Sequence, residues 1–220
     1  MSDTSSGVVD LLGALAYAEL TGFLRLAEDA ATLAPTLTDR AELSDLAAVE
    51  HRHFRLLRDR LVELGVDPEE AMAPFVDAFD SWHALTRPSD WLEALVKAYV
   101  GTGIAMDFYR EAARRVGPDI AGLVEEALAD EGRSEFAVER VRAALEREPK
   151  AAGRLALWSR RLVGEALSQA HRVAAARPAL AALLVEAGEG EDLPEIGRLF
   201  ARLTEQHAKR MSALGLSASS

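Results

Sequence analysis

Glu50 and His53 are the two side chains in this sequence whose types and spacing point most clearly to chemistry. They are three residues apart, so on an α-helix both lie on one face and can reach the same ion. In helix bundles that build a di-iron site, a Glu-x-x-His pair on an inward face supplies a carboxylate and an imidazole ligand. The same pattern also occurs where both side chains lie at the edge of the apolar face and reach water. The surrounding residues must decide between these two interpretations.

The residues around this pair predict a helix over residues 41–64. Asp39 can cap its start, and Glu42 three residues later completes a capping box. Apolar residues then recur at steps of three, four or seven and form one helix face, made by Leu43, Leu46, Leu57 and Leu64. Glu50 and His53 stand on this face where leucines are expected, which favours an inward-facing site.

A preceding helix over residues 7–33 carries a third polar residue of the same kind. Glu19 interrupts its apolar face, and Pro35 ends the helix before a short turn at Thr36. Two long helices with a short link must lie antiparallel. Glu19 lies about as far before that turn as Glu50 and His53 lie after it, so the three side chains are expected at one level of the helix pair.

The next part of the chain predicts a second helix pair. Residues 66–89 form a long connection, rich in Pro and Asp, that suits a crossover between the ends of a bundle. Asp90 with Glu93 predicts a capping box, and Gly117-Pro118 predicts a tight turn between two helices. The predicted fold class is therefore all-α. It is a ferritin-like four-helix bundle over residues 7–146, two antiparallel pairs joined by the crossover, with C-terminal helices over residues 150–214 packed on it in one domain of residues 1–220.

The second pair offers only part of a matching metal site. A symmetric di-iron bundle needs a carboxylate-x-x-His motif on the fourth helix and a carboxylate on the third. Asp130 takes the carboxylate place on the fourth helix, but Arg133 follows it where histidine is needed. Guanidinium stays protonated and cannot ligate a metal. On the third helix the facing residue is Thr102, and the nearest acidic residues are the weaker candidates Asp107 and Glu111.

Length and composition exclude several classes of function. The 220 residues contain 49% hydrophobic side chains, enough for a packed core, and no cysteine, so disulfides, thiolate metal sites and cysteine nucleophiles are excluded. No signal peptide or uncharged run of membrane-spanning length is expected, and a cytoplasmic setting fits. The net charge of −11 argues against general affinity for nucleic acid through its phosphates.

The predicted long helix from Lys150 to Ala176 carries a row of basic residues: Lys150, Arg154, Arg160, Arg161, Arg172 and Arg177. A solvated helix face and a docking surface for an anionic partner are both consistent with this pattern. We also expect that the protein can pair with a second copy of itself as a homodimer.

Four stretches carry a resemblance to a known family: LAYAELTGFLRLAEDA, AAVEHRHFRLLRDRLVELGVDPEEAMAPF, WLEALVKAYVGTGIAMDFYREAA and GRLALWSRRLVGEALSQA. Over roughly residues 10–205 the chain resembles the actinobacterial ferritin-like proteins that are similar to the isopentenyladenosine-tRNA hydroxylase (MiaE-like). The resemblance implies a ferritin-like bundle, a non-haem di-iron centre, an O₂-dependent oxidation and a tRNA substrate. This chain departs from the family pattern at Thr102, where an acidic residue is usual, and at Arg133, where histidine is usual.

Two functional hypotheses follow. In the first, one or two non-haem irons held by Glu19, Glu50, His53 and Asp130 support an oxidoreductase, a hydroxylase-like monooxygenase. In the second, Arg133 replaces the metal by pairing with one of these carboxylates, and the protein is a non-catalytic helical binding or scaffold protein. The catalytic and substrate-binding residues stay unassigned in either case.

Overall fold

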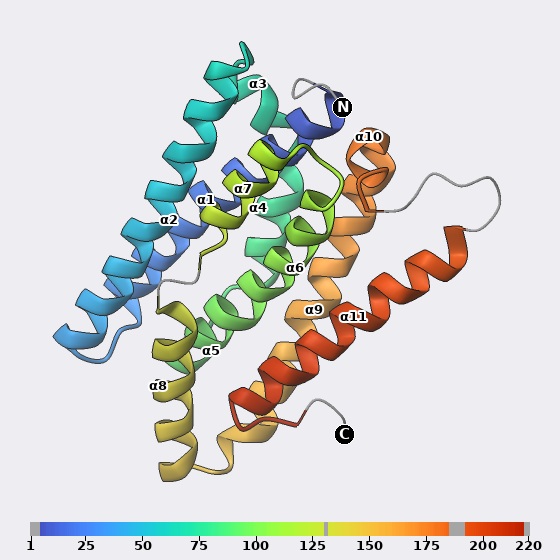
Figure 1. Ribbon diagram of the computed structural model, residues 1–220. Coiled ribbons are helices and arrows are strands. Elements are labelled where there is room, and N and C mark those ends of the chain that lie inside the picture. The colour runs from blue at the N-terminus through green and yellow to red at the C-terminus, as the bar shows by residue number, and fades with distance from the viewer. Residues whose placement is uncertain (1–4, 130–131, 185–191, 218–220) are drawn as a thin grey trace.

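The computed structural model describes residues 5–129, 132–184 and 192–217, and for residues 192–200 it describes the backbone only. All regular elements in these ranges are helices (Figure 1). The all-α prediction is therefore confirmed, and the two long N-terminal helices lie antiparallel as expected. Asp130, one of the predicted metal ligands, lies outside the described residues.

The first helix pair consists of α1 (Ser6–Thr32) and α2 (Leu37–Glu63). The start of α2 differs from the predicted one, because Thr36 is the N-cap and its hydroxyl accepts a hydrogen bond from the backbone of Asp39 at 3.0 Å. Asp39 is thus the third helical residue rather than the cap. Its carboxylate accepts from the hydroxyl of Thr36 at 2.7 Å, which tightens the same first turn.

The crossover contains short helices of its own: α3 (Pro68–Met72), the 3₁₀ turn η1 (Ala73–Phe75) and α4 (Val76–Leu85). The third bundle helix follows as α5 (Trp91–Val96), a π-helical turn η2 (Lys97–Gly101) and α6 (Thr102–Ala113). Asp90 caps α5 by accepting from the backbone of Glu93 at 2.9 Å, as the sequence predicts. The π-helical turn lies where Gly101 and Gly103 weaken the helix, and such turns are frequent at functional sites.

The predicted fourth helix is wrong as a single element. It is divided into α7 (Pro118–Ala127) and α8 (Arg133–Arg147), which Figure 1 shows as two helices with different axes. Gly132 precedes α8 with φ of 93°, a left-handed conformation that glycine adopts without a Cβ clash. The interruption makes Arg133 the first residue of α8.

The C-terminal part consists of α9 (Ala151–Ala176), α10 (Pro178–Ala181) and α11 (Asp192–Ala213). Two of the basic residues predicted to face solvent or a partner are bound within the molecule. Arg154 pairs with Glu93 at 2.6 Å and Asp90 at 2.8 Å, and Arg177 pairs with the buried Asp10. Part of the basic row therefore forms ion pairs that connect the ends of α9 to the bundle.

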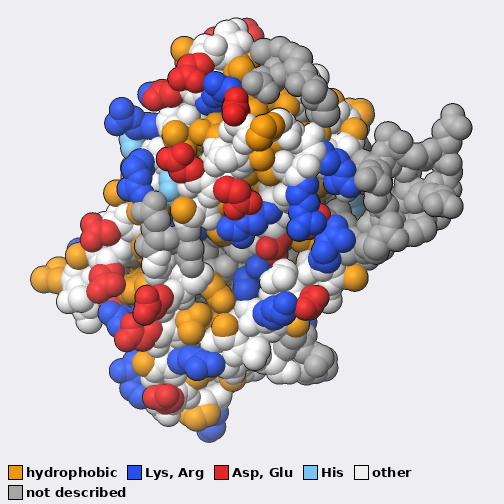
Figure 2. All heavy atoms as spheres, in the orientation of Figure 1, with side chains coloured by type: hydrophobic (Ala, Val, Ile, Leu, Met, Phe, Trp, Pro, Cys, Tyr) orange, Lys and Arg blue, Asp and Glu red, His pale blue; other side chains and the backbone are white. Residues whose placement is uncertain are grey.

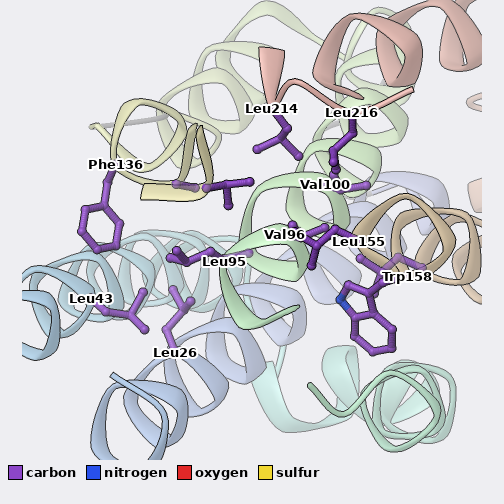
Figure 3. Packing of buried hydrophobic residues seen from close by; sticks show 14 of the residues in the cluster. Leu26, Leu43, Leu95, Val96, Val100, Phe136, Leu155, Trp158, Leu214 and Leu216 are labelled. Carbon is purple, nitrogen blue, oxygen red and sulfur yellow. The ribbon is translucent and has the colours of Figure 1, made fainter. Parts of the chain in front are cut away.

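The buried apolar residues form two clusters at opposite ends of the bundle. One joins the C-terminal half of α1 and the N-terminal half of α2 to α5, α8 and α9, as Figure 3 shows around Leu95, Phe136 and Trp158. The other joins the remaining halves of α1 and α2 to α3, α7 and the end of α6, with Leu15 and Leu57 among its members. On both α1 and α2 the polar residues singled out from the sequence lie between the two clusters.

Helix α1 is long and apolar enough to cross a membrane by length and composition alone. From the sequence, no such segment is expected. In the structure 61% of the most apolar part of α1 is buried inside the protein, where it packs along α2. This placement is that of the core helix of a bundle.

Candidate functional site

Four ionisable side chains are buried together between the two apolar clusters. Glu19 comes from α1, Glu50 and His53 from successive turns of α2, and Arg133 from the start of α8; each is at most 6% exposed. Burial of a charged group is very costly unless a partner compensates it. The contacts among these four side chains therefore determine what the site can do.

Arg133 pairs with Glu50. Its Nη2 donates a hydrogen bond to Glu50 Oε1, and both side chains are almost fully buried. Gly22 on α1 makes room for this carboxylate, because a Cβ added there would lie 2.8 Å from Glu50 Oε2. The contact between Arg133 and a carboxylate that the sequence predicts is present in the structure.

Glu19 and His53 face each other beside this pair. His53 Nδ1 lies 3.5 Å from Glu19 Oε2, so α1 and α2 bring the two residues to one level as their equal distance from the turn predicts. Glu19 Oε2 is buried and has no hydrogen-bond partner among the described residues, and the same holds for Arg133 Nε. The cluster thus has unused hydrogen-bonding capacity on both a carboxylate and a guanidinium.

Burial sets the protonation of Glu19. Desolvation raises the pKa of Glu19 to about 8, against the attraction of Arg133, which lowers it. A carboxyl with this pKa is mostly protonated at neutral pH. The Tyr109 hydroxyl on α6 shares this environment, since its burial and the nearby Glu19 both raise the pKa of its phenol. Burial lowers the pKa of Arg133, and the Glu19 carboxylate opposes that shift.

The weaker candidates Asp107 and Glu111 do not join this cluster. Asp107 accepts a hydrogen bond from Arg210 at 2.5 Å, and Glu111 accepts two from Arg202 at 2.8 and 3.1 Å. Both arginines belong to α11, so these two carboxylates hold the last helix against α6. Across the described residues, no group of three or more His, Asp or Glu side chains could hold one metal ion.

Three residues of this region do not stand out in the sequence. Gly22 and Tyr109 approach the cluster from α1 and α6, and Arg210 from α11 lies over Gly103. Gly22 could have been found, because it stands one helical turn after Glu19 on the same face. Arg210 could not, since its contact with α6 spans about a hundred residues of sequence.

Comparison with known proteins agrees with this architecture. A family described as "Ferritin-like domain, actinomycetes" matches residues 3–187. Among solved structures, "Protein 19 with aldehyde deformylating oxidase activity from Synechococcus" aligns with a TM-score of 0.66 at 18% identity, over 97% of this chain and 90% of that one. At this identity the likeness is one of fold, and no curated protein matches the chain. Because the family match covers most of the sequence, the chain belongs to the ferritin-like domain family of actinomycetes.

Proposed function

We propose that this ferritin-like protein works without a di-iron centre, as a helical binding protein in which Arg133 supplies the positive charge that a metal would otherwise supply. The buried contact between Arg133 and Glu50 is the observation that carries this proposal. A guanidinium group fills the space beside a carboxylate with a fixed cation and several N–H donors.

The described residues do not fit a di-iron centre. Such a centre takes a histidine from each of two helices and a carboxylate from each of four. The residue that reaches the cluster from α8 is Arg133, which cannot ligate a metal. The carboxylates of α6 at Asp107 and Glu111 are engaged by arginines of α11. We therefore derive no reaction step that passes through iron.

Charge balance supports the same conclusion. Glu50 and Arg133 neutralise each other, and Glu19 is mostly protonated at neutral pH because its pKa is raised to about 8. The described acidic and guanidinium groups of the cluster are thus balanced without a further cation. Because its two partners come from α8 and α2, this pair links the start of α8 to the middle of α2.

An iron-dependent oxidoreductase is the second candidate, and one observation favours it. Glu19 Oε2 is buried, lacks a hydrogen-bond partner among the described residues, and lies near His53, as two ligands of one ion would. In this candidate Glu19, Glu50, His53 and Asp130 hold the iron. The hydroxylase reaction and the tRNA substrate that the resemblance implies are part of this second candidate. A cytoplasmic homodimer is compatible with either candidate.

A ligand-restoring variant separates the two candidates. Thr102 and Arg133 line the same pocket, and Arg133 contacts Glu50, so the substitutions Thr102→Asp and Arg133→His introduce two potential ligands on this side of Glu50. We expect the double variant to bind more ferrous iron per chain than the unmodified protein does in anaerobic titration. Arg147→His, at an exposed position of the same helix α8, is the matched control and should bind no more than the unmodified protein. Binding of two irons per chain by the unmodified protein, with no gain in the double variant, would refute the proposal.

A further inference from the structure

A pocket opens next to Arg133 of the buried cluster. It has a volume of about 270 Å³ and lies between η2, α6, the start of α8 and α11. Arg133 lines it, so one side chain connects the pocket to Glu50 in the interior. Figure 2 shows Lys and Arg side chains gathered over the side of the molecule where α6 and α11 lie.

Three arginines supply the polar wall of this pocket: Arg110 from α6, Arg133 from α8 and Arg210 from α11. The Nε atoms of Arg133 and Arg210 are buried and have no hydrogen-bond partner among the described residues. Arg133 is only 5% exposed, so its side chain is held in place where it lines the pocket. No Asp or Glu lines the pocket in the part of the chain that the structure describes.

The pocket also lies at the N-terminal end of α8, a helix of 15 residues. Ser134, its second residue, lines the pocket beside Arg133. The first backbone N–H groups of a helix have no partner within it and carry a partial positive charge, which favours an anion. The helix end and the buried arginine donor therefore both favour the binding of an anion.

The net charge around the pocket decides which kind of anion fits. Each arginine already has a carboxylate behind it: Glu50 for Arg133, Asp107 for Arg210 and Glu125 for Arg110. The pocket thus offers directed N–H donors and little excess positive charge. A monoanion accepts hydrogen bonds from such donors and adds one negative charge to the pocket, whereas a phosphate dianion adds two, so the pocket favours the monoanion. The planar fork of arginine matches a carboxylate in particular.

The remaining wall is partly apolar. Tyr99 and Met106 face the pocket from η2 and α6. A Cβ added at Gly103 would lie 2.6 Å from Arg210 Cδ, so glycine at this position lets the arginine stem lie close against α6. The volume is slightly below the range of about 300–1,000 Å³ that is usual for drug-sized ligands. The ligand is therefore small, with one charged end and a short apolar body.

We propose that this pocket binds a small organic monocarboxylate, whose carboxylate accepts hydrogen bonds from Arg110, Arg133 and Arg210 and whose apolar part contacts Tyr99 and Met106. The inference rests on the proposed binding function and names its ligand class. Arg210 lies beyond residue 187, where the family match ends, so the pocket is completed by a helix outside the matched domain.

Isothermal titration calorimetry of the full chain with hexanoate tests this proposal. We expect saturable binding of hexanoate, and weaker binding of hexan-1-ol and of inorganic phosphate. Arg110→Gln should weaken hexanoate binding by about tenfold, the lower end of the effect of losing a hydrogen bond to a charged group. Arg110 is 42% exposed and makes only long hydrogen bonds, to Glu125 at 3.4 Å and to the Leu128 carbonyl at 3.3 Å, so this variant is expected to fold.

Arg114→Gln is the matched control. Arg114 follows Arg110 by one helical turn and is 66% exposed, and it does not line the pocket. Equal loss of binding in both variants would show a non-specific charge effect and overturn the proposal. Equal binding of hexan-1-ol, tighter binding of phosphate, or no binding of hexanoate would overturn it as well. Iron content, measured on the same samples, reports on the role of Arg133 separately, so failure of the pocket and failure of the proposed function are distinguishable.

Discussion

Replacing Arg133 by alanine tests the buried ion pair most sharply. Arg133 and Glu50 are 5% and 4% exposed, so the variant leaves a carboxylate without its cation in the interior. Removing one partner of a buried pair typically costs about 3–5 kcal/mol. For a chain of this size each kcal/mol lowers Tm by about 2–4 °C, so we expect Tm to fall by about 6–20 °C.

Urea unfolding followed by circular dichroism measures this loss, with two further variants for comparison. Arg147→Ala changes the same residue type at an exposed position of α8 and should alter the free energy of unfolding by less than about 0.5 kcal/mol. The double variant Arg133→Met with Glu50→Leu replaces the pair by apolar side chains of similar size. It should recover most of the stability lost in Arg133→Ala, because no unpaired charge stays buried.

If Arg133→Ala costs no more than Arg147→Ala, Arg133 does not compensate the buried charge of Glu50. If the double variant is less stable than Arg133→Ala, the pair contributes through something other than charge compensation. The single variants Arg133→Met and Glu50→Leu complete a double-mutant cycle, which gives the coupling energy between the two residues.

Further predictions follow from the same structure. The pKa of Glu19 is about 8 in the folded protein and lower in the unfolded chain, so the folded state binds more protons between these values and stability should decrease as pH rises from about 5 to 8. Glu19→Gln should make the urea midpoint nearly independent of pH across this range. An unchanged pH dependence in this variant would contradict the raised pKa of Glu19. Asp90→Ala should lower the free energy of unfolding by about 1 kcal/mol through loss of the cap on Glu93, and Asp90→Asn should retain most of it. Gly132→Ala should cost about 1–2 kcal/mol, because alanine is strained at φ of 93°, and a neutral effect in thermal unfolding would show that the turn before α8 can rearrange.

The parts of the fold that the sequence predicts are those governed by local rules. The antiparallel pair of α1 and α2 follows from two apolar faces and a short link, and it brings Glu19 and His53 to one level. The cap at Asp90 follows from a capping box. At α2 two overlapping capping patterns compete, and the hydroxyl of Thr36 forms the cap in place of Asp39.

The features that the sequence does not predict depend on contacts between distant segments. The division into α7 and α8 interrupts an apolar pattern that continues through it, and Gly132 alone is a weak signal for such a break. Asp107 and Glu111 have the residue types of metal ligands, but arginines of α11 about ninety to a hundred residues later engage them. The roles of Glu19, Glu50, His53 and Asp130 as ligands stay predictions.

The iron content of the unmodified protein decides whether Arg133 takes the place of a metal. The protein is produced with iron supplied, purified without chelator, and analysed for metal per chain by mass spectrometry with inductively coupled plasma. Because Arg133 compensates Glu50 and Glu19 is mostly protonated, we predict less than one iron per chain. Two irons per chain, with the Arg133 side chain directed to solvent in the crystal structure of that sample, would contradict the account and favour the oxidoreductase.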